Sequence, residues 1–154
     1  MNPSPTDRLE RMVVIRAPRA RVWRALTDPK EFGAWFGVRM EGDAVFAPGA
    51  RVQAAITHPG YEHVIWDVTI ERMEAERRFS WRWHPYAVER GVDYSHEPTT
   101  LVEFTLEDVP EGTRLTVIES GFDHVPVARR AQAWRMNGEG WTAQVESIRR
   151  HVAG

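Results

Sequence analysis

Apolar and polar residues alternate along most of the chain between residues 8 and 120. Such alternation is typical of β-strands, because successive side chains point to opposite faces of a sheet. The dipeptides Pro48-Gly49, Pro59-Gly60 and Glu111-Gly112 are turn signals between these segments. Closely spaced strands with tight turns predict an antiparallel meander. The predicted strands cover residues 8–17, 44–46, 51–57, 64–71, 79–85, 100–107 and 114–120.

Two short helices are predicted between the first and second strands, at residues 18–28 and 29–37. Apolar residues in the first helix follow the i, i+3, i+4 spacing of an amphipathic helix. Asp28 is a suitable N-cap for the second helix, Pro29 suits its first position, and Gly37 is placed to end it. The two apolar faces consist of Val22, Ala25 and Leu26, and of Phe32, Trp35 and Phe36.

The C-terminal third of the chain has a different periodicity. Its apolar residues are separated alternately by four and three positions, which predicts one amphipathic helix of roughly seven turns. Gly138 and Gly140 fall inside this pattern and indicate a bend or a close backbone approach. The stripe consists of Val127, Ala131, Trp134, Gly138, Trp141, Val145, Ile148 and Val152.

These elements predict an α+β fold. A curved antiparallel sheet of about six to seven strands has an apolar face that must be covered. The last helix is the only element long enough to cover it, so we expect the aromatic residues of 79–83 to face Trp134 and Trp141. We expect residues 1–7 to form a flexible N-terminal tail and residues 8–154 to form a single domain.

Composition narrows the class of protein. The chain has 154 residues, no cysteine and a net charge of −2, and it contains no long basic run, so we expect neither disulfides nor nucleic-acid binding. No segment suits a signal peptide or a membrane span, and we therefore expect a cytoplasmic protein without membrane insertion. We also expect a monomer. Seven tryptophans indicate an aromatic core or an aromatic cavity.

Four segments together resemble a known family: 22–37, 46–52, 79–107, and 112–123 with 137–141. Their order and spacing resemble the START-like (SRPBCC) superfamily and, within it, the activator of heat-shock protein 90 ATPase homologue family. The resemblance implies the helix-grip (birch-pollen-allergen-like) fold. It also implies a cavity between the sheet and the long helix, in which a hydrophobic small molecule, lipid-like or aromatic, binds.

The predicted cavity wall combines the inward residues of the strands with aromatic residues of the helices. The alternative is that these side chains fill the space, since protein interiors are close-packed. The candidate lining residues are Trp35, Phe36, Val64, Trp66, Phe79, Trp81, Trp83, Val102, Phe104, Val117, Glu119, Trp134 and Trp141.

Glu119 is the polar residue of this set. Alternation from Leu115 and Val117 points it inward, where a buried carboxyl has a raised pKa and suits ligand orientation or acid–base chemistry. Because Ser120 and Gly121 follow, it also suits a strand end where the carboxylate meets water or pairs with Arg135, and we favour this interpretation.

The 84–98 loop is longer than a usual hairpin connection and suits either a lid over the cavity or a polar surface loop. His84 and His96 in it lack the spacing of metal ligands, and we expect no metal and no cofactor.

Two other functions remain open. One is an enzyme, of cyclase or hydrolase type, with Glu119 and a loop histidine or tyrosine as acid and base, although no catalytic motif is present. The other is a chaperone-associated role, for which Trp23 or the 84–98 loop supplies an exposed patch. The eukaryotic activator has an additional N-terminal chaperone-binding domain that this sequence lacks, which argues against the chaperone partner.

Overall fold

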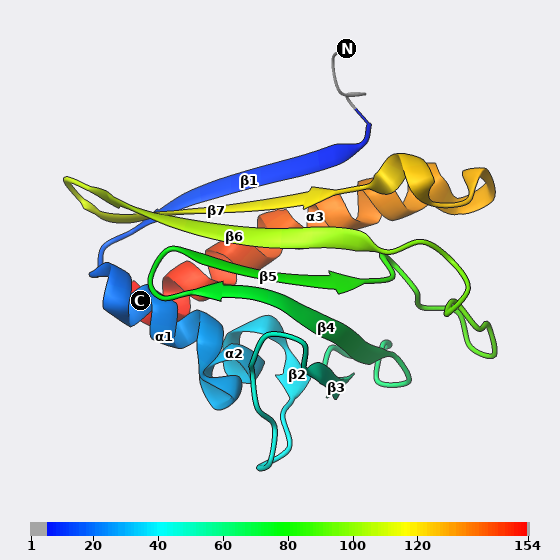
Figure 1. Ribbon diagram of the computed structural model, residues 1–154, viewed down its shortest axis with the longest axis horizontal. Helices are drawn as coiled ribbons and strands as arrows, with labels where there is room; N and C mark the ends of the chain where they lie inside the picture. Colours follow the sequence, from blue (N-terminus) through cyan, green and yellow to red (C-terminus); the bar gives the residue numbers. More distant parts are fainter. Residues whose placement is uncertain (1–5, 154) are drawn as a thin grey trace.

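The computed structural model describes residues 6–153 and confirms the predicted helix-grip arrangement (Figure 1). A seven-stranded antiparallel sheet curves around one long helix, and two short helices connect the first two strands. The elements are β1 (Arg8–Ile15), α1 (Arg19–Thr27), α2 (Pro29–Phe36), β2 (Val38–Arg39), β3 (Arg51–Ile56), β4 (Ile65–Glu74), β5 (Arg78–Trp83), β6 (Thr100–Val109), β7 (Gly112–Ser120), the 3-10 turn η1 (Phe122–His124) and α3 (Val127–Ala153).

The strand order is β1-β7-β6-β5-β4-β3-β2, so the first strand pairs with the last. Arg8 lies opposite Ser120 and Ile15 opposite Thr113 in this antiparallel pair. All other strands pair with their neighbours in sequence, as predicted for a meander. Residues 1–5 of the predicted tail lie outside the described residues, whereas the backbone oxygen of Asp7 accepts hydrogen bonds from Gly121 and Phe122.

Two details of the prediction are wrong. Residues 44–46 are not a strand, and the short second strand is instead β2, at Val38–Arg39, directly after α2. β2 pairs with the end of β3, where Val38 lies opposite Ile56. A two-residue strand has no alternation to detect, so the sequence pattern did not indicate it.

The caps of the short helices are as predicted. Asp28 ends α1, and its side chain accepts hydrogen bonds from the backbone N–H groups of Lys30 and Glu31 at 2.9 and 3.2 Å at the start of α2. Gly37 follows α2 with a φ of 96°, a left-handed conformation that costs glycine little. The two helices are therefore held in a fixed bend beside the sheet.

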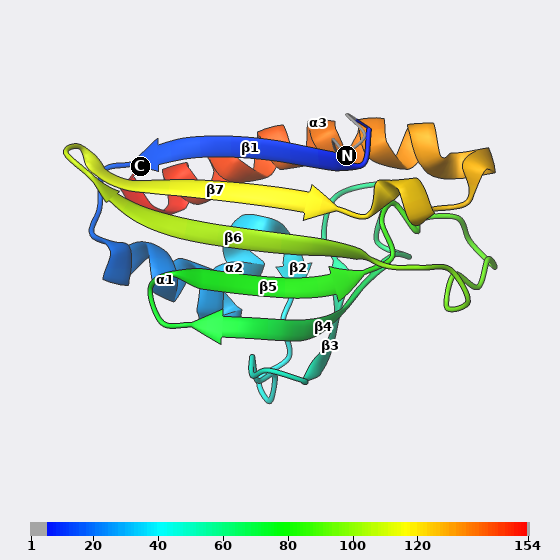
Figure 2. The same ribbon diagram turned by 45° about the horizontal axis from the view of Figure 1, so that its top comes forward.

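Helix α3 runs along one face of the sheet, and its N-terminal part extends beyond the strands (Figure 2). Trp141, Val145 and Ile148 of the predicted apolar stripe are buried. At the other end of the stripe Val127 is 78% exposed, and Ala131 is exposed as well. The periodicity predicted the helix correctly, but only the part that lies against the sheet is covered.

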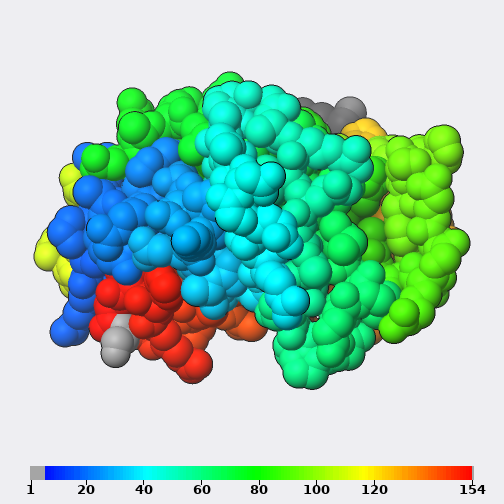
Figure 3. Space-filling view, turned by 90° about the horizontal axis from the view of Figure 1, so that it is seen from below, coloured from blue at the N-terminus to red at the C-terminus, as the bar shows by residue number. Residues whose placement is uncertain are grey.

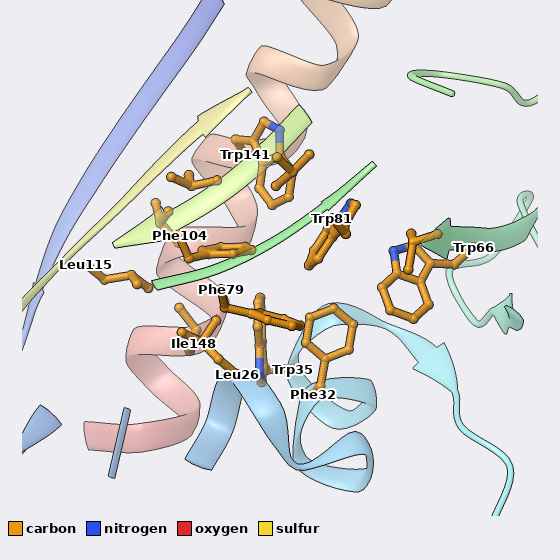
Figure 4. Packing of buried hydrophobic residues seen from close by; sticks show 14 of the residues in the cluster. Leu26, Phe32, Trp35, Trp66, Phe79, Trp81, Phe104, Leu115, Trp141 and Ile148 are labelled. Carbon is orange, nitrogen blue, oxygen red and sulfur yellow. The ribbon is translucent and has the colours of Figure 1, made fainter. Parts of the chain in front are cut away.

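An aromatic cluster fills the space between the sheet and the helices (Figure 4). Phe32 of α2 contacts Trp66 of β4 and Trp81 of β5, with ring centroids 4.9 and 5.7 Å apart. Trp23, the candidate for an exposed patch, is half-buried and packs edge-to-face on Phe79 at 6.4 Å. The core thus includes α1 and α2 as well as α3.

Candidate functional site

The bulky side chains at the centre of the concave face are packed against one another. Phe79, Trp81 and Phe104 are at most 1% exposed, and Trp141 of α3 is 3% exposed. The centroid of the Trp141 ring lies 5.7 Å from Phe104 and 6.3 Å from Trp81. These rings fill the space between the middle of the sheet and the helix.

A cleft of about 1210 Å³ lies beside this packed cluster, between β4, the C-terminal end of α2, helix α3 and the 84–98 loop. Its walls include residues 56–59, residues 63–67, residues 83–84 and residues 86–95. Helix α3 contributes Asn137, Gly140, Ala143, Gln144 and Ser147. Figure 3 shows the segment around residues 56–63 and the 84–98 loop next to each other on one face of the molecule.

The predicted site residues divide between the cleft and the packed interior. The structure brings together five of them at the cleft: Trp35, Phe36, Val64, Trp66 and Trp83. The others that pack in the interior without forming part of the cleft wall are Phe79, Trp81, Val102, Phe104, Val117, Glu119 and Trp141. The open space is therefore at the end of the sheet near the 84–98 loop, and the middle of the sheet is closed.

Trp134 lies apart from both groups. Its indole N–H donates to the backbone oxygen of Arg8 at 3.2 Å, at the edge of the sheet formed by β1. It is half-buried and borders a smaller hollow with Arg130, Ala131 and Arg135. The expectation that Trp134 faces the aromatic residues of β5 is wrong, because this part of α3 lies beside β1 at the edge of the sheet.

Glu119 points inward and is fully buried, with 0% exposure, so the strand-end interpretation is wrong. Its carboxyl group accepts hydrogen bonds from four neutral side chains on three other elements. The indole N–H groups of Trp83 and Trp141 donate at 2.7 and 2.8 Å, the hydroxyl of Thr100 at 2.5 Å, and the amide of Asn137 at 3.0 and 3.2 Å. The carboxyl thereby joins β5, β6, β7 and α3.

Burial raises the pKa of Glu119, although the hydrogen bonds from Thr100, Trp141, Trp83 and Asn137 lower it and so oppose that effect. A carboxylate has about four lone-pair sites. Four donors occupy them, so contact with a further molecule requires one of these bonds to break. Because Trp83 and Asn137 also line the cleft, Glu119 lies directly behind its wall.

The 84–98 loop is fastened to the rest of the molecule at several points. Arg129 of α3 forms an ion pair with Glu97 at 2.7 Å, donates to the backbone oxygen of Pro85 at 2.7 Å and lies 4.7 Å from the centre of the Tyr94 ring. On the opposite side His63 Nε2 lies 2.9 Å from the backbone oxygen of Val88. These contacts hold the loop as a wall of the cleft.

The charged residues of the cleft do not form a metal centre. Arg51 and Asp67 form an ion pair at 2.7 Å, which lowers the pKa of Asp67. Within residues 6–153, no group of three or more histidine, aspartate or glutamate side chains is arranged to hold a metal ion. No helix in the same range is both long and apolar enough to span a bilayer.

Comparison with known proteins identifies the family. The curved sheet, the long helix in its concave face and the adjoining cleft define a helix-grip protein. The sequence pattern of the family described as Activator of Hsp90 ATPase homolog 1-like protein matches residues 16–153. The chain belongs to this family. A comparison with curated proteins found no match.

Solved structures share the fold over nearly the whole chain. Protein MLL2253 from Mesorhizobium loti is 26% identical, with a TM-score of 0.71, over 94% of this chain and 95% of that one. DynU16, from the dynemicin biosynthetic locus, is 28% identical with a TM-score of 0.70, and the match covers 96% of this chain and 47% of DynU16. Ms6760 from Mycobacterium smegmatis, 19% identical with a TM-score of 0.72 over 97% of this chain and 92% of its own, shows the fold alone.

Sequence reasoning missed three residues at the site: Asn137, His63 and Arg129. Asn137 lies four positions before the predicted Trp141 on α3, and this spacing places both side chains on one face of the helix, where both contact Glu119. The contributions of His63 and Arg129 had no comparable signal, because each contacts a loop whose path has no periodicity.

Proposed function

We propose that this protein binds a small, mainly apolar molecule in the cleft beside the aromatic cluster. The observation that carries the proposal is the size and lining of the cleft. Its volume, about 1210 Å³, accommodates a ligand of drug size or a lipid-like chain. Aromatic rings from three elements, Trp35, Trp66 and Trp83, contribute to the wall.

The rigidity of this wall supports binding over a purely structural role for the rings. Side chains from α3 fix the end of α2, because Gln144 donates to the backbone oxygen of Phe36 at 2.7 Å and Ser147 to that of Trp35 at 2.6 Å. Glu119 holds Trp83 and Asn137 from behind. A wall fixed before the ligand arrives loses little conformational entropy on binding.

The test is a binding screen with neutral aromatic and lipid-like compounds, including 2-methoxynaphthalene and 1-dodecanol. We expect a change in tryptophan fluorescence, since Trp66 and Trp83 line the cleft. We also expect an increase in melting temperature, because a ligand at 100 times its Kd stabilises the native state by roughly 2.7 kcal/mol. If the whole panel leaves both signals unchanged, the proposal is wrong.

A pair of variants assigns the binding to the cleft. Gly140 lines the cleft, and a Cβ added there meets nothing within 4 Å, so Gly140→Phe fills part of the space without a clash at the backbone. Its exposed neighbour Glu139 does not line the cleft, and Glu139→Phe is the matched control. In calorimetric titrations we expect Gly140→Phe to weaken binding by about tenfold, or roughly 1.4 kcal/mol, and Glu139→Phe to leave it unchanged.

A further inference from the structure

The wall of the cleft contains a buried nitrogen whose hydrogen-bonding need is not met within residues 6–153. His63 lies in the connection between β3 and β4, and its Nδ1 atom is buried without a partner. The other ring nitrogen, Nε2, lies 2.9 Å from the backbone oxygen of Val88. Both residues line the cleft.

The contact with Val88 determines which nitrogen carries the proton in the neutral ring. A backbone carbonyl oxygen only accepts hydrogen bonds, so Nε2 of His63 must be the donor. In the neutral imidazole the second nitrogen, Nδ1, then has a free lone pair and is an acceptor. A buried acceptor without a donor costs free energy, which a ligand donor in the cleft would recover.

A second unmet group lies on the same wall. The indole N–H of Trp66 is buried and has no acceptor among the described residues. Trp66 is 2% exposed, and its ring packs on Phe32 and Phe36. Two residues that line the cleft therefore carry unmet buried groups, one that needs a donor and one that needs an acceptor.

The described ionic groups of the cleft offer no buried, unpaired charge that would bind a charged ligand near His63 and Trp66. Arg51 and Asp67 neutralise each other, and Glu89, Arg90 and Asp93 are exposed to solvent. The aromatic wall and the two unmet groups together suit a neutral apolar molecule with a hydroxyl group. A hydroxyl is the simplest group that is both a donor and an acceptor.

Building on the proposed binding function, we infer that the ligand is an apolar alcohol or phenol whose hydroxyl donates to Nδ1 of His63. The indole N–H of Trp66 is placed on the same wall to donate to a ligand oxygen. His63 is thus a specificity-determining residue, which distinguishes hydroxylated molecules from hydrocarbons and ethers of the same shape.

The test compares 2-naphthol with 2-methoxynaphthalene, which keeps the ring and the oxygen but has no donor. We expect the wild-type protein to bind 2-naphthol about tenfold more tightly, as measured by isothermal calorimetry. If both compounds bind equally, binding is established but the inference is wrong. If neither binds while another member of the panel does, the inference alone is wrong, and if the whole panel fails to bind, the proposed function fails as well.

The variant His63→Gln separates the donor role of Nε2 from the acceptor role of Nδ1. The glutamine amide has an N–H at about the position of Nε2, so the bond to Val88 is kept, but no acceptor remains at the position of Nδ1. We expect the preference for 2-naphthol to fall to about twofold or less, with binding of 2-methoxynaphthalene unchanged.

A control is available at a histidine outside the cleft. His96 lies in the 84–98 loop, is exposed and is not among the residues that line the cleft. His96→Gln should keep the tenfold preference. Equal loss of the preference in both variants would overturn the inference, because the effect would then not depend on the acceptor at His63.

Discussion

At the scale of single residues, Glu119 is the buried group that most needs hydrogen-bond partners. It is the only acidic side chain among the buried residues of the described chain, and four donors from Trp83, Thr100, Asn137 and Trp141 meet on it. None of these donors carries a charge. The carboxyl therefore organises polar groups that would otherwise lie unpaired in an aromatic core.

We expect Glu119→Leu to lower the free energy of unfolding by at least about 3 kcal/mol, because it leaves several buried donors without an acceptor. Urea denaturation followed by fluorescence measures this change. The control is Glu107→Leu, an exposed position on β6, where we expect a change within about 0.5 kcal/mol. Similar effects of the two substitutions would contradict the assigned role of Glu119.

At the scale of elements, α3 contains two glycines that differ in their surroundings. A Cβ at Gly140 meets nothing within 4 Å. A Cβ at Gly138 lies 3.1 Å from Nη2 of Arg11 and 3.4 Å from Cδ2 of Leu9, on the side that packs against β1. Of these two glycines, only Gly138 allows a close approach of the helix to the sheet.

Gly140→Ala should therefore stabilise the protein by about 1 kcal/mol, because alanine loses less backbone entropy in a helix. This corresponds to an increase in melting temperature of roughly 2–4 °C, measured by calorimetry. Gly138→Ala should give a smaller increase or none, since Arg11 and Leu9 must shift. Equal stabilisation by both substitutions would show that Gly138 has no packing role.

At the scale of the whole molecule, Glu31 joins the three helices. Its carboxylate forms ion pairs with Arg21 and Arg24 of α1, at 2.8 Å each, and with His151 of α3 at 3.0 Å. Partial burial raises the pKa of Glu31, but hydrogen bonds from His151, Arg21 and Arg24 outweigh this and lower it overall. The group thus titrates below its ordinary range in the folded protein.

A carboxyl with a lowered pKa stabilises the fold above its unfolded pKa of about 4.3, and this contribution is lost as the pH falls through the folded value. We expect Glu31→Gln to reduce the free energy of unfolding by about 1 kcal/mol at pH 7. The difference from wild type should shrink below about pH 4 in a series of urea titrations. A difference that is constant with pH would mean that packing, not charge, is responsible.

The control is Glu146→Gln. The ion pairs of Glu146 with Arg149 and Arg150 lie within α3, so we expect this substitution to have a smaller effect.

Much of the fold was predictable because its elements have regular patterns. Alternation identified the long strands, the caps at Asp28 and Gly37 bounded the short helices, and apolar spacing predicted α3. The site was less predictable. Alternation correctly turned Glu119 inward, yet the nearby turn signal favoured the opposite interpretation, because sequence spacing does not reveal the donors on other elements.

The sequence by itself determined the succession of strands and helices and the aromatic character of one sheet face, and its resemblance to a known family implied the helix-grip architecture. Local periodicity is sufficient for the first two, since it states which side of each element is apolar. Tertiary structure alone decided that the centre of that face is filled, that Trp134 lies at the edge of the sheet beside β1, and that the cleft opens beside the 84–98 loop. Whether rings fill or line a space depends on the distance between elements, and that distance is set by contacts among residues far apart in the chain, such as Arg129 with Glu97 and Glu119 with Trp83.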